Sequence, residues 1–207
     1  KSPKDLEGKK MGIVPTSFEV PFLPAYAKRA GFDLSKVELI HMDNKIIEQA
    51  LIQGSVDAIS GSATSSVPKF LARKKPIQFI LFSDAGFSMY SQTIVSQPEF
   101  IKKEPNLVQD FTDGLFEGIK YTLLNPDEAL DIFFKVVPEH ALTKKGRDFT
   151  RLGYGLWQQS LLVDEVKNHG LGYMDMAKVT DMTTLIMDNV AKNAPIRPDP
   201  KVLFTNK

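Results

Sequence analysis

Small hydroxyl side chains gather in two short stretches that read as turns. Thr16, Ser17 and Phe18 form part of the first turn, and the second, GSATSS, holds Gly61, Ser62 and Thr64. Hydroxyls and free N–H groups at the start of a helix suit an anionic or polar ligand group. Simple helix capping needs only one hydroxyl per turn, so the excess in the second turn favours a polar wall. Capping in the first turn and a merely flexible loop in the second remain alternatives.

A third turn combines a carboxylate, an aromatic ring and a phenol, in the stretch SDAGFSMY. Asp84 suits a ligand amine or hydroxyl, although an Asp that closes a turn onto its own backbone is an equal alternative. Tyr90 suits either a ligand contact or a core position. None of the three turns contains Lys or Arg, so an anion there would depend on backbone N–H groups and hydroxyls.

The first half of the chain alternates short apolar runs with helix-like stretches, which is the arrangement that would position these turns. The sequence predicts strands at 10–14, 37–41, 56–60 and 78–82, and helices at 18–30, 44–53 and 67–74. Such alternation with short connections indicates a mainly parallel sheet with flanking helices. In that kind of sheet the turns after the strands open into one crevice, where ligands bind. A further strand is expected at 90–96, with a hinge just before it.

From about residue 97 the pattern becomes helical. Apolar residues repeat with three-and-four spacing over 105–124, which predicts one amphipathic helix. Further helices are expected at 127–136, 145–162 and 176–192. We therefore expect an α/β lobe over 1–96 and a mostly helical C-terminal part over 97–207.

Composition and motifs exclude several classes of function. The 26 Lys and Arg nearly balance the 25 Asp and Glu, so nothing attracts nucleic acid or anionic lipid in general. With no Cys and three scattered His residues, no thiolate nucleophile, iron–sulfur cluster or metal site is indicated. No nucleophile elbow, phosphate-binding loop or zinc-protease motif occurs, and no apolar run reaches the ~20 residues that span a bilayer. We expect a binding protein without a cofactor, not an enzyme.

Several phrases follow one another in a familiar order, namely KSPKDLEGKKMGIVPTSFE, GSVDAISGSATS and FSDAGFSMYSQTIVSQPEFIKKEPNLVQDF, ending with NHGLGYMD and VLFTN. The order resembles ABC-transporter substrate-binding proteins of the sulfonate, taurine, nitrate and thiamine-precursor group. The resemblance implies a type II periplasmic-binding-protein fold, in which two α/β lobes close on a solute around a hinge. It also implies ligand contacts from three regions: Thr16 to Phe18, Gly61 to Thr64, and Asp84 with Tyr90.

The resemblance carries further expectations about partners and place. It implies ABC permease subunits as partners, a small-molecule solute, and a periplasmic or membrane-anchored extracellular location. In the family the phrase SPKDLEGKK lies well inside the chain, whereas here it begins at residue 2. We therefore expect this sequence to lack most of the first lobe, and a dimer becomes an option if that lobe is absent.

Two other functions stand as alternatives. A ligand-sensing or adaptor domain would use the same lobe to regulate a partner without feeding a transporter. A pyrimidine-precursor synthase shares the fold and the group name, but its family is marked by a Cys-rich motif that this chain does not contain.

Overall fold

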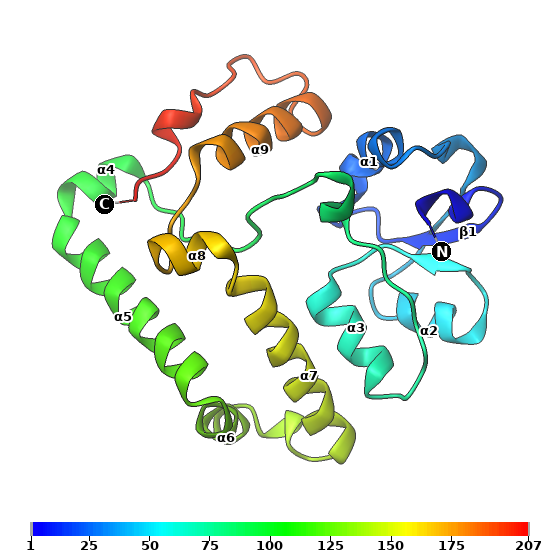
Figure 1. Cartoon of the computed structure of the whole chain (residues 1–207), viewed down its shortest axis with the longest axis horizontal. Helices are drawn as coiled ribbons and strands as arrows, with labels where there is room; N and C mark the ends of the chain where they lie inside the picture. Colours follow the sequence, from blue (N-terminus) through cyan, green and yellow to red (C-terminus); the bar gives the residue numbers. More distant parts are fainter. Residues whose placement is uncertain (1, 207) are drawn as a thin grey trace.

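The computed structural model describes residues 2–206 and has an α/β part followed by a helical part (Figure 1). The sheet contains β1 (Lys10–Ile13), β2 (Glu38–His41) and β3 (Ala58–Ile59) in the order β2-β1-β3. Both pairings are parallel, with Met11 opposite Leu39 on one side and Ala58 on the other. This confirms the predicted α/β class and three of the predicted strands, those at 10–14, 37–41 and 56–60.

Helices follow the strands as the alternation predicts. The α/β part contains α1 (Leu23–Ala30), α2 (Ile47–Gln53) and α3 (Ala63–Leu71). The helical part contains α4 (Pro98–Lys103), α5 (Pro105–Leu124), α6 (Pro126–Val136), α7 (Lys144–Leu161), α8 (Asp164–His169) and α9 (Met176–Asn189). Short 3₁₀ segments include η2 (Val20–Phe22), η4 (Phe82–Ala85) and η5 (Pro138–His140).

The core of the α/β part lies between β1 and α1. Ile13 and Leu23 are each 2% exposed, and Tyr26 of α1 stacks on Phe82 at 4.3 Å between ring centroids. Leu185 of α9 is buried in the same cluster, so α9 packs against the α/β part. Burial of these side chains supplies the main driving force for this part of the fold.

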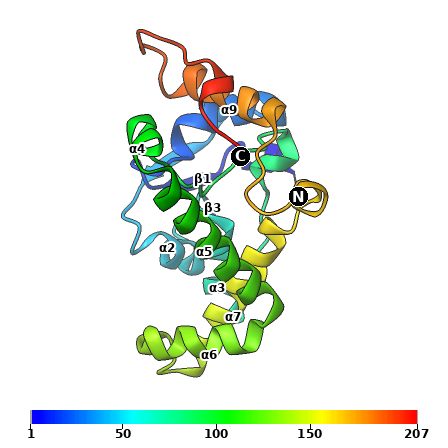
Figure 2. The same ribbon diagram turned by 90° about the vertical axis from the view of Figure 1, so that its left-hand side faces the viewer.

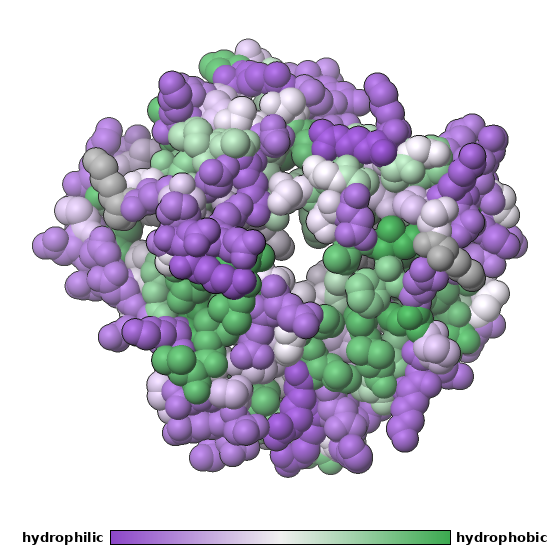
Figure 3. All heavy atoms as spheres, in the orientation of Figure 1, coloured by the Kyte–Doolittle hydropathy of each residue, from purple (hydrophilic) through white to green (hydrophobic). Residues whose placement is uncertain are grey.

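The helical part touches the α/β part mainly through α7, which packs against α3. Helices α5, α6 and α7 extend away from the sheet (Figure 2). The space-filling view shows an opening near the centre of the molecule, between the helices and the α/β part (Figure 3). None of the described helices is both long and apolar enough to cross a membrane.

Two predicted strands are wrong. Residues 78–82 and 90–96 form no strand; the first run ends in η4 and the second is an irregular connection. A strand needs a neighbouring strand to pair with, and in the described residues β1, β2 and β3 pair with one another and with neither of these two runs. Accordingly, Phe79 is 53% and Val95 is 85% exposed.

Helix α5 has the bounds that its periodicity predicts, yet it buries no residue. Leu107, Phe111 and Leu115 of its apolar face are 55%, 61% and 39% exposed. In Figure 3 apolar atoms gather over the region of α5 and α6. The apolar face of α5 is therefore covered only in part, since Val108, Phe116 and Ile119 are half-buried while Leu107 and Phe111 are exposed.

Candidate functional site

The sheet brings the first two predicted turns together. Thr16 to Phe18 follow β1, and Gly61 to Thr64 follow β3, its direct neighbour. The strands are parallel, so both turns leave from the same edge of the sheet. Beyond the last paired residues, the Ser60 N–H donates to the Gly12 carbonyl at 3.0 Å and keeps the two segments side by side.

A buried hydrogen bond ties the two turns to each other. The Ser60 hydroxyl donates to Glu19 Oε1 at 3.0 Å, and both residues are buried, at 8% and 7% exposure. A buried carboxylate needs such partners, because desolvation otherwise opposes its charge. The sequence analysis does not single out Glu19, which directly follows Phe18 in the first turn.

The hydroxyls of these turns are not used as helix caps. Ser62 is the N-cap residue of α3, but its side chain accepts no capping hydrogen bond. Instead its hydroxyl lies 3.0 Å from that of Thr64. In the first turn, η2 is preceded by Glu19 and α1 by Phe22, so neither Thr16 nor Ser17 occupies a cap position.

The exposure of these residues fits a surface that a ligand can reach. Thr16, Ser62 and Thr64 are exposed, and the Phe18 ring is 63% exposed. An exposed aromatic face beside several hydroxyls can stack on a flat ring while the hydroxyls and N–H groups bind its polar atoms. We refer to Thr16 to Phe18 and Gly61 to Thr64 as the paired turns.

Asp84 does not join the paired turns. Its Oδ2 accepts from the Leu81 N–H at 3.2 Å, which closes η4 onto its own backbone. Gly86 ends this turn in the left-handed region, with φ 78°. Asp84 also borders a separate depression of about 610 Å³, with Tyr26 and Arg29. Burial, with a smaller contribution from the Asp84 charge, raises the pKa of Tyr26.

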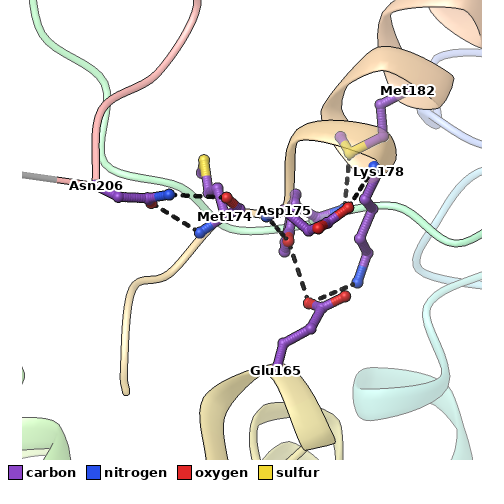
Figure 4. Close-up of polar contacts among 7 residues, drawn as sticks. Glu165, Met174, Asp175, Lys178, Met182 and Asn206 are labelled. Carbon is purple, nitrogen blue, oxygen red and sulfur yellow. Dashed lines mark hydrogen bonds and ion pairs between the residues drawn. The ribbon is translucent and has the colours of Figure 1, made fainter. Parts of the chain in front are cut away.

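Tyr90 contacts Glu165, Asp175 and Lys178 of the helical part, and Figure 4 shows these three residues close together. Its hydroxyl donates to Glu165 Oε2 at 3.1 Å and accepts from the Asp175 N–H at 2.8 Å. Lys178 Nζ lies 3.3 Å from the same Glu165 oxygen and 4.3 Å from the centre of the Tyr90 ring. We call Tyr90, Glu165, Asp175 and Lys178 the Tyr90 cluster.

The Tyr90 cluster joins three segments that are distant in sequence: the connection after η4, α8 and the start of α9. Asp175 also caps α9, since its Oδ1 accepts from the Lys178 N–H at 2.9 Å. Burial, together with the hydrogen bond to Glu165, raises the pKa of Tyr90. Sequence analysis predicts Tyr90 as a ligand contact, whereas Glu165 and Lys178 lie in no motif that would indicate them.

The sequence profile described as NMT1/THI5 like matches residues 1–129 of the chain. The chain belongs to this family. The match confirms the resemblance to substrate-binding proteins of the thiamine-precursor group that the ordered phrases indicate. The matched range spans the sheet, the paired turns and the whole of α5.

Relatives of this NMT1/THI5-like chain are named as binding proteins. A riboflavin-binding protein of Chloroflexus aurantiacus is 25% identical over 100% of this chain and 57% of its own length. A formylaminopyrimidine-binding protein of Halalkalibacterium halodurans is 23% identical over 63% of this chain and 40% of its own length. A Brucella abortus protein named only for binding is 26% identical over 72% of this chain. The chain thus spans about half the length of these relatives.

The described residues contain no group of three or more His, Cys, Asp or Glu side chains arranged to hold a metal ion. The paired turns contain no Lys or Arg. Their chemistry is that of hydroxyls, backbone N–H groups and one aromatic ring. Such a surface can hold and orient a small molecule.

Proposed function

We propose that this chain is the solute-binding portion of an extracytoplasmic substrate-binding protein that serves an ABC importer. The solute is a small polar organic molecule or anion, held at the paired turns between two lobes. In this proposal the protein binds and releases the solute without changing it. The observation that carries the proposal is that two hydroxyl-rich turns leave adjacent parallel strands and are not spent on helix capping.

The names of the relatives narrow the class of solute. Riboflavin and formylaminopyrimidine both contain flat, nitrogen-bearing aromatic rings. Phe18 offers a face for such a ring, and the hydroxyls of Ser62 and Thr64 offer partners for its ring nitrogens and carbonyls. We therefore place nitrogen heteroaromatic compounds ahead of sulfonates and nitrate, since no cation of the paired turns would balance an anion.

In the complete protein we propose that closure around a hinge completes the site. A solute shifts the open and closed states only by the difference in its affinity for them, so both lobes must contact it. The closed form would then dock on the permease, in the periplasm or at the outer face of a membrane. A ligand-sensing domain is the second candidate, because the same paired turns would serve it equally well.

The test is titration calorimetry of the chain with riboflavin, formylaminopyrimidine, taurine and nitrate. We expect one of the heteroaromatic compounds to bind, and the double substitution Ser62→Ala and Thr64→Ala to weaken binding at least about tenfold, as for lost hydrogen bonds to a polar ligand. Thr180→Ala is the matched control, because its hydroxyl bonds within α9 and is exposed. It should leave the affinity unchanged.

Two results would contradict the proposal in different ways. Binding that is unaffected by the double substitution would place the solute elsewhere on the chain. If mass spectrometry showed that a bound compound is chemically converted, this would support the synthase alternative instead.

A further inference from the structure

A second cavity lies at the other end of α3 from the paired turns, between α3 and α7. Its volume is about 440 Å³, which is within the size range of small-molecule sites. Its lining includes Ala72 and Arg73 just after α3, Glu139 and His140 of η5, and Lys145 and Phe149 of α7. At 1.5 Å per residue, Thr64 and Leu71 of α3 are roughly 10 Å apart, so this cavity is separate from the paired turns.

Close packing at the start of α7 shapes one wall of the cavity. A Cβ atom at Gly146 would lie 2.6 Å from the His140 carbonyl oxygen, so only glycine fits there. The His140 ring lies 3.1 Å from the Thr150 hydroxyl and 6.0 Å, between centroids, from the ring of Phe149. This packing therefore holds the His140 imidazole and the Phe149 ring in defined positions in the wall.

The charges around the cavity leave a positive excess. Lys69 is paired with the buried carboxylate of Glu48 at 2.5 Å, so its charge is already balanced. Arg73 and Lys145 have no ion pair among the described residues, and Glu139 is the carboxylate that opposes them. Two unpaired cations beside one carboxylate leave about one positive charge for a ligand.

We propose that the α3–α7 cavity binds a small amphipathic monoanion: a flat apolar body that ends in one carboxylate or sulfonate. The body would lie against Ala72 and Phe149, and the acidic group would lie between Arg73 and Lys145. A guanidinium matches the two oxygens of such a group, and its planar fork gives the pairing direction. This site is independent of the paired turns, so it stands whether or not the proposed solute site is correct.

The probe is naphthoate, and naphthamide is its neutral partner of the same shape. Two-dimensional amide spectra of the whole chain should show shifts for Gly146, Phe149 and Arg73 on addition of naphthoate. We expect naphthamide to bind at least about tenfold more weakly, because it lacks the charge. The double substitution Arg73→Gln and Lys145→Gln should lower the affinity for naphthoate at least about tenfold. Arg73→Glu should lower this affinity further.

The control removes the same charge elsewhere. Lys102→Gln with Lys103→Gln on α4 changes the net charge equally and should leave the naphthoate affinity as it is. Ser62→Ala with Thr64→Ala should also leave it unchanged, which separates this site from the proposed solute site. The inference is overturned if naphthoate and naphthamide bind equally, if the Arg73 and Lys145 substitutions have no effect, or if the shifts fall on the paired turns.

Discussion

Both parts of this molecule carry regular apolar patterns, but they bury those patterns to different extents. In the α/β part, β1 and α1 bury their apolar residues against each other, and Ile13 and Leu23 are each 2% exposed. In the helical part, α5 also carries a regular apolar face, but none of its residues is fully buried. A periodic pattern therefore predicts an element, because it depends on local spacing, but it does not predict the partner that covers the element.

The largest expected effect tests this contrast directly. Ile13→Ala removes three buried carbons from the core and should lower the free energy of unfolding by about 2–5 kcal/mol. Phe111→Ala on α5 removes a larger side chain that is 61% exposed, and should change it by less than about 0.5 kcal/mol. Urea unfolding followed by circular dichroism measures both. Equal losses would mean that the apolar face of α5 is covered in solution.

A smaller effect is expected at the bond that ties the paired turns. Ser60→Ala leaves the buried Glu19 carboxylate without the hydroxyl 3.0 Å away, so we expect a loss of about 1–3 kcal/mol. Ser65→Ala is the control, because Ser65 is exposed and its hydroxyl bonds a carbonyl of its own turn. It should change the free energy of unfolding by less than about 0.5 kcal/mol.

The result at Ser60 also bears on ligand binding. If the bond from Ser60 to Glu19 holds the paired turns in position, Ser60→Ala should lower the affinity for the solute, although Ser60 itself does not line the surface. A loss of stability without any change in affinity would make Ser60 a core residue only.

Local signals explain which elements the sequence predicts well. Proline at position 105 and Asn125-Pro126 bracket the three-and-four repeat of α5, and the helix runs from Pro105 to Leu124. The strands at 78–82 and 90–96 failed because an apolar run only becomes a strand where a neighbour pairs with it. Pairing is a property of distant parts of the chain, and short runs carry no record of it.

The same distinction applies to the candidate residues. The paired turns could be predicted because hydroxyls follow recognisable strands, and parallel order brings such turns to one edge. Glu165 and Lys178 could not be predicted, because they lie 75 and 88 positions from Tyr90 in the sequence. Glu165 accepts a hydrogen bond from the Tyr90 hydroxyl, and Lys178 lies over the Tyr90 ring. Asp84 illustrates the ambiguity of a single carboxylate in a turn, since here it bonds its own backbone.

The smallest expected effect concerns the Tyr90 cluster, which links the two parts. Tyr90→Phe removes the bond to Glu165 and the acceptor for the Asp175 N–H, and should cost about 1 kcal/mol near neutral pH. Because burial raises the pKa of Tyr90 above its usual 10.0, the folded state holds this proton more tightly than the unfolded state. The contribution is therefore complete below about pH 10 and is lost as the pH rises through the folded pKa.

Urea unfolding of the wild type and Tyr90→Phe between about pH 8 and 11 measures this loss. The gap between the free energies of unfolding of the two proteins should narrow as the pH rises. Subtracting the variant removes the titration of the other tyrosines, including Tyr26 and Tyr154, whose pKa values burial also raises. Tyr173→Phe is the control, because its ring stacks on His169 at 4.1 Å and its hydroxyl has no hydrogen bond among the described residues. A gap that stays constant with pH would show that the Tyr90 hydroxyl is solvated, and that the cluster does not hold the helical part to the rest of the chain.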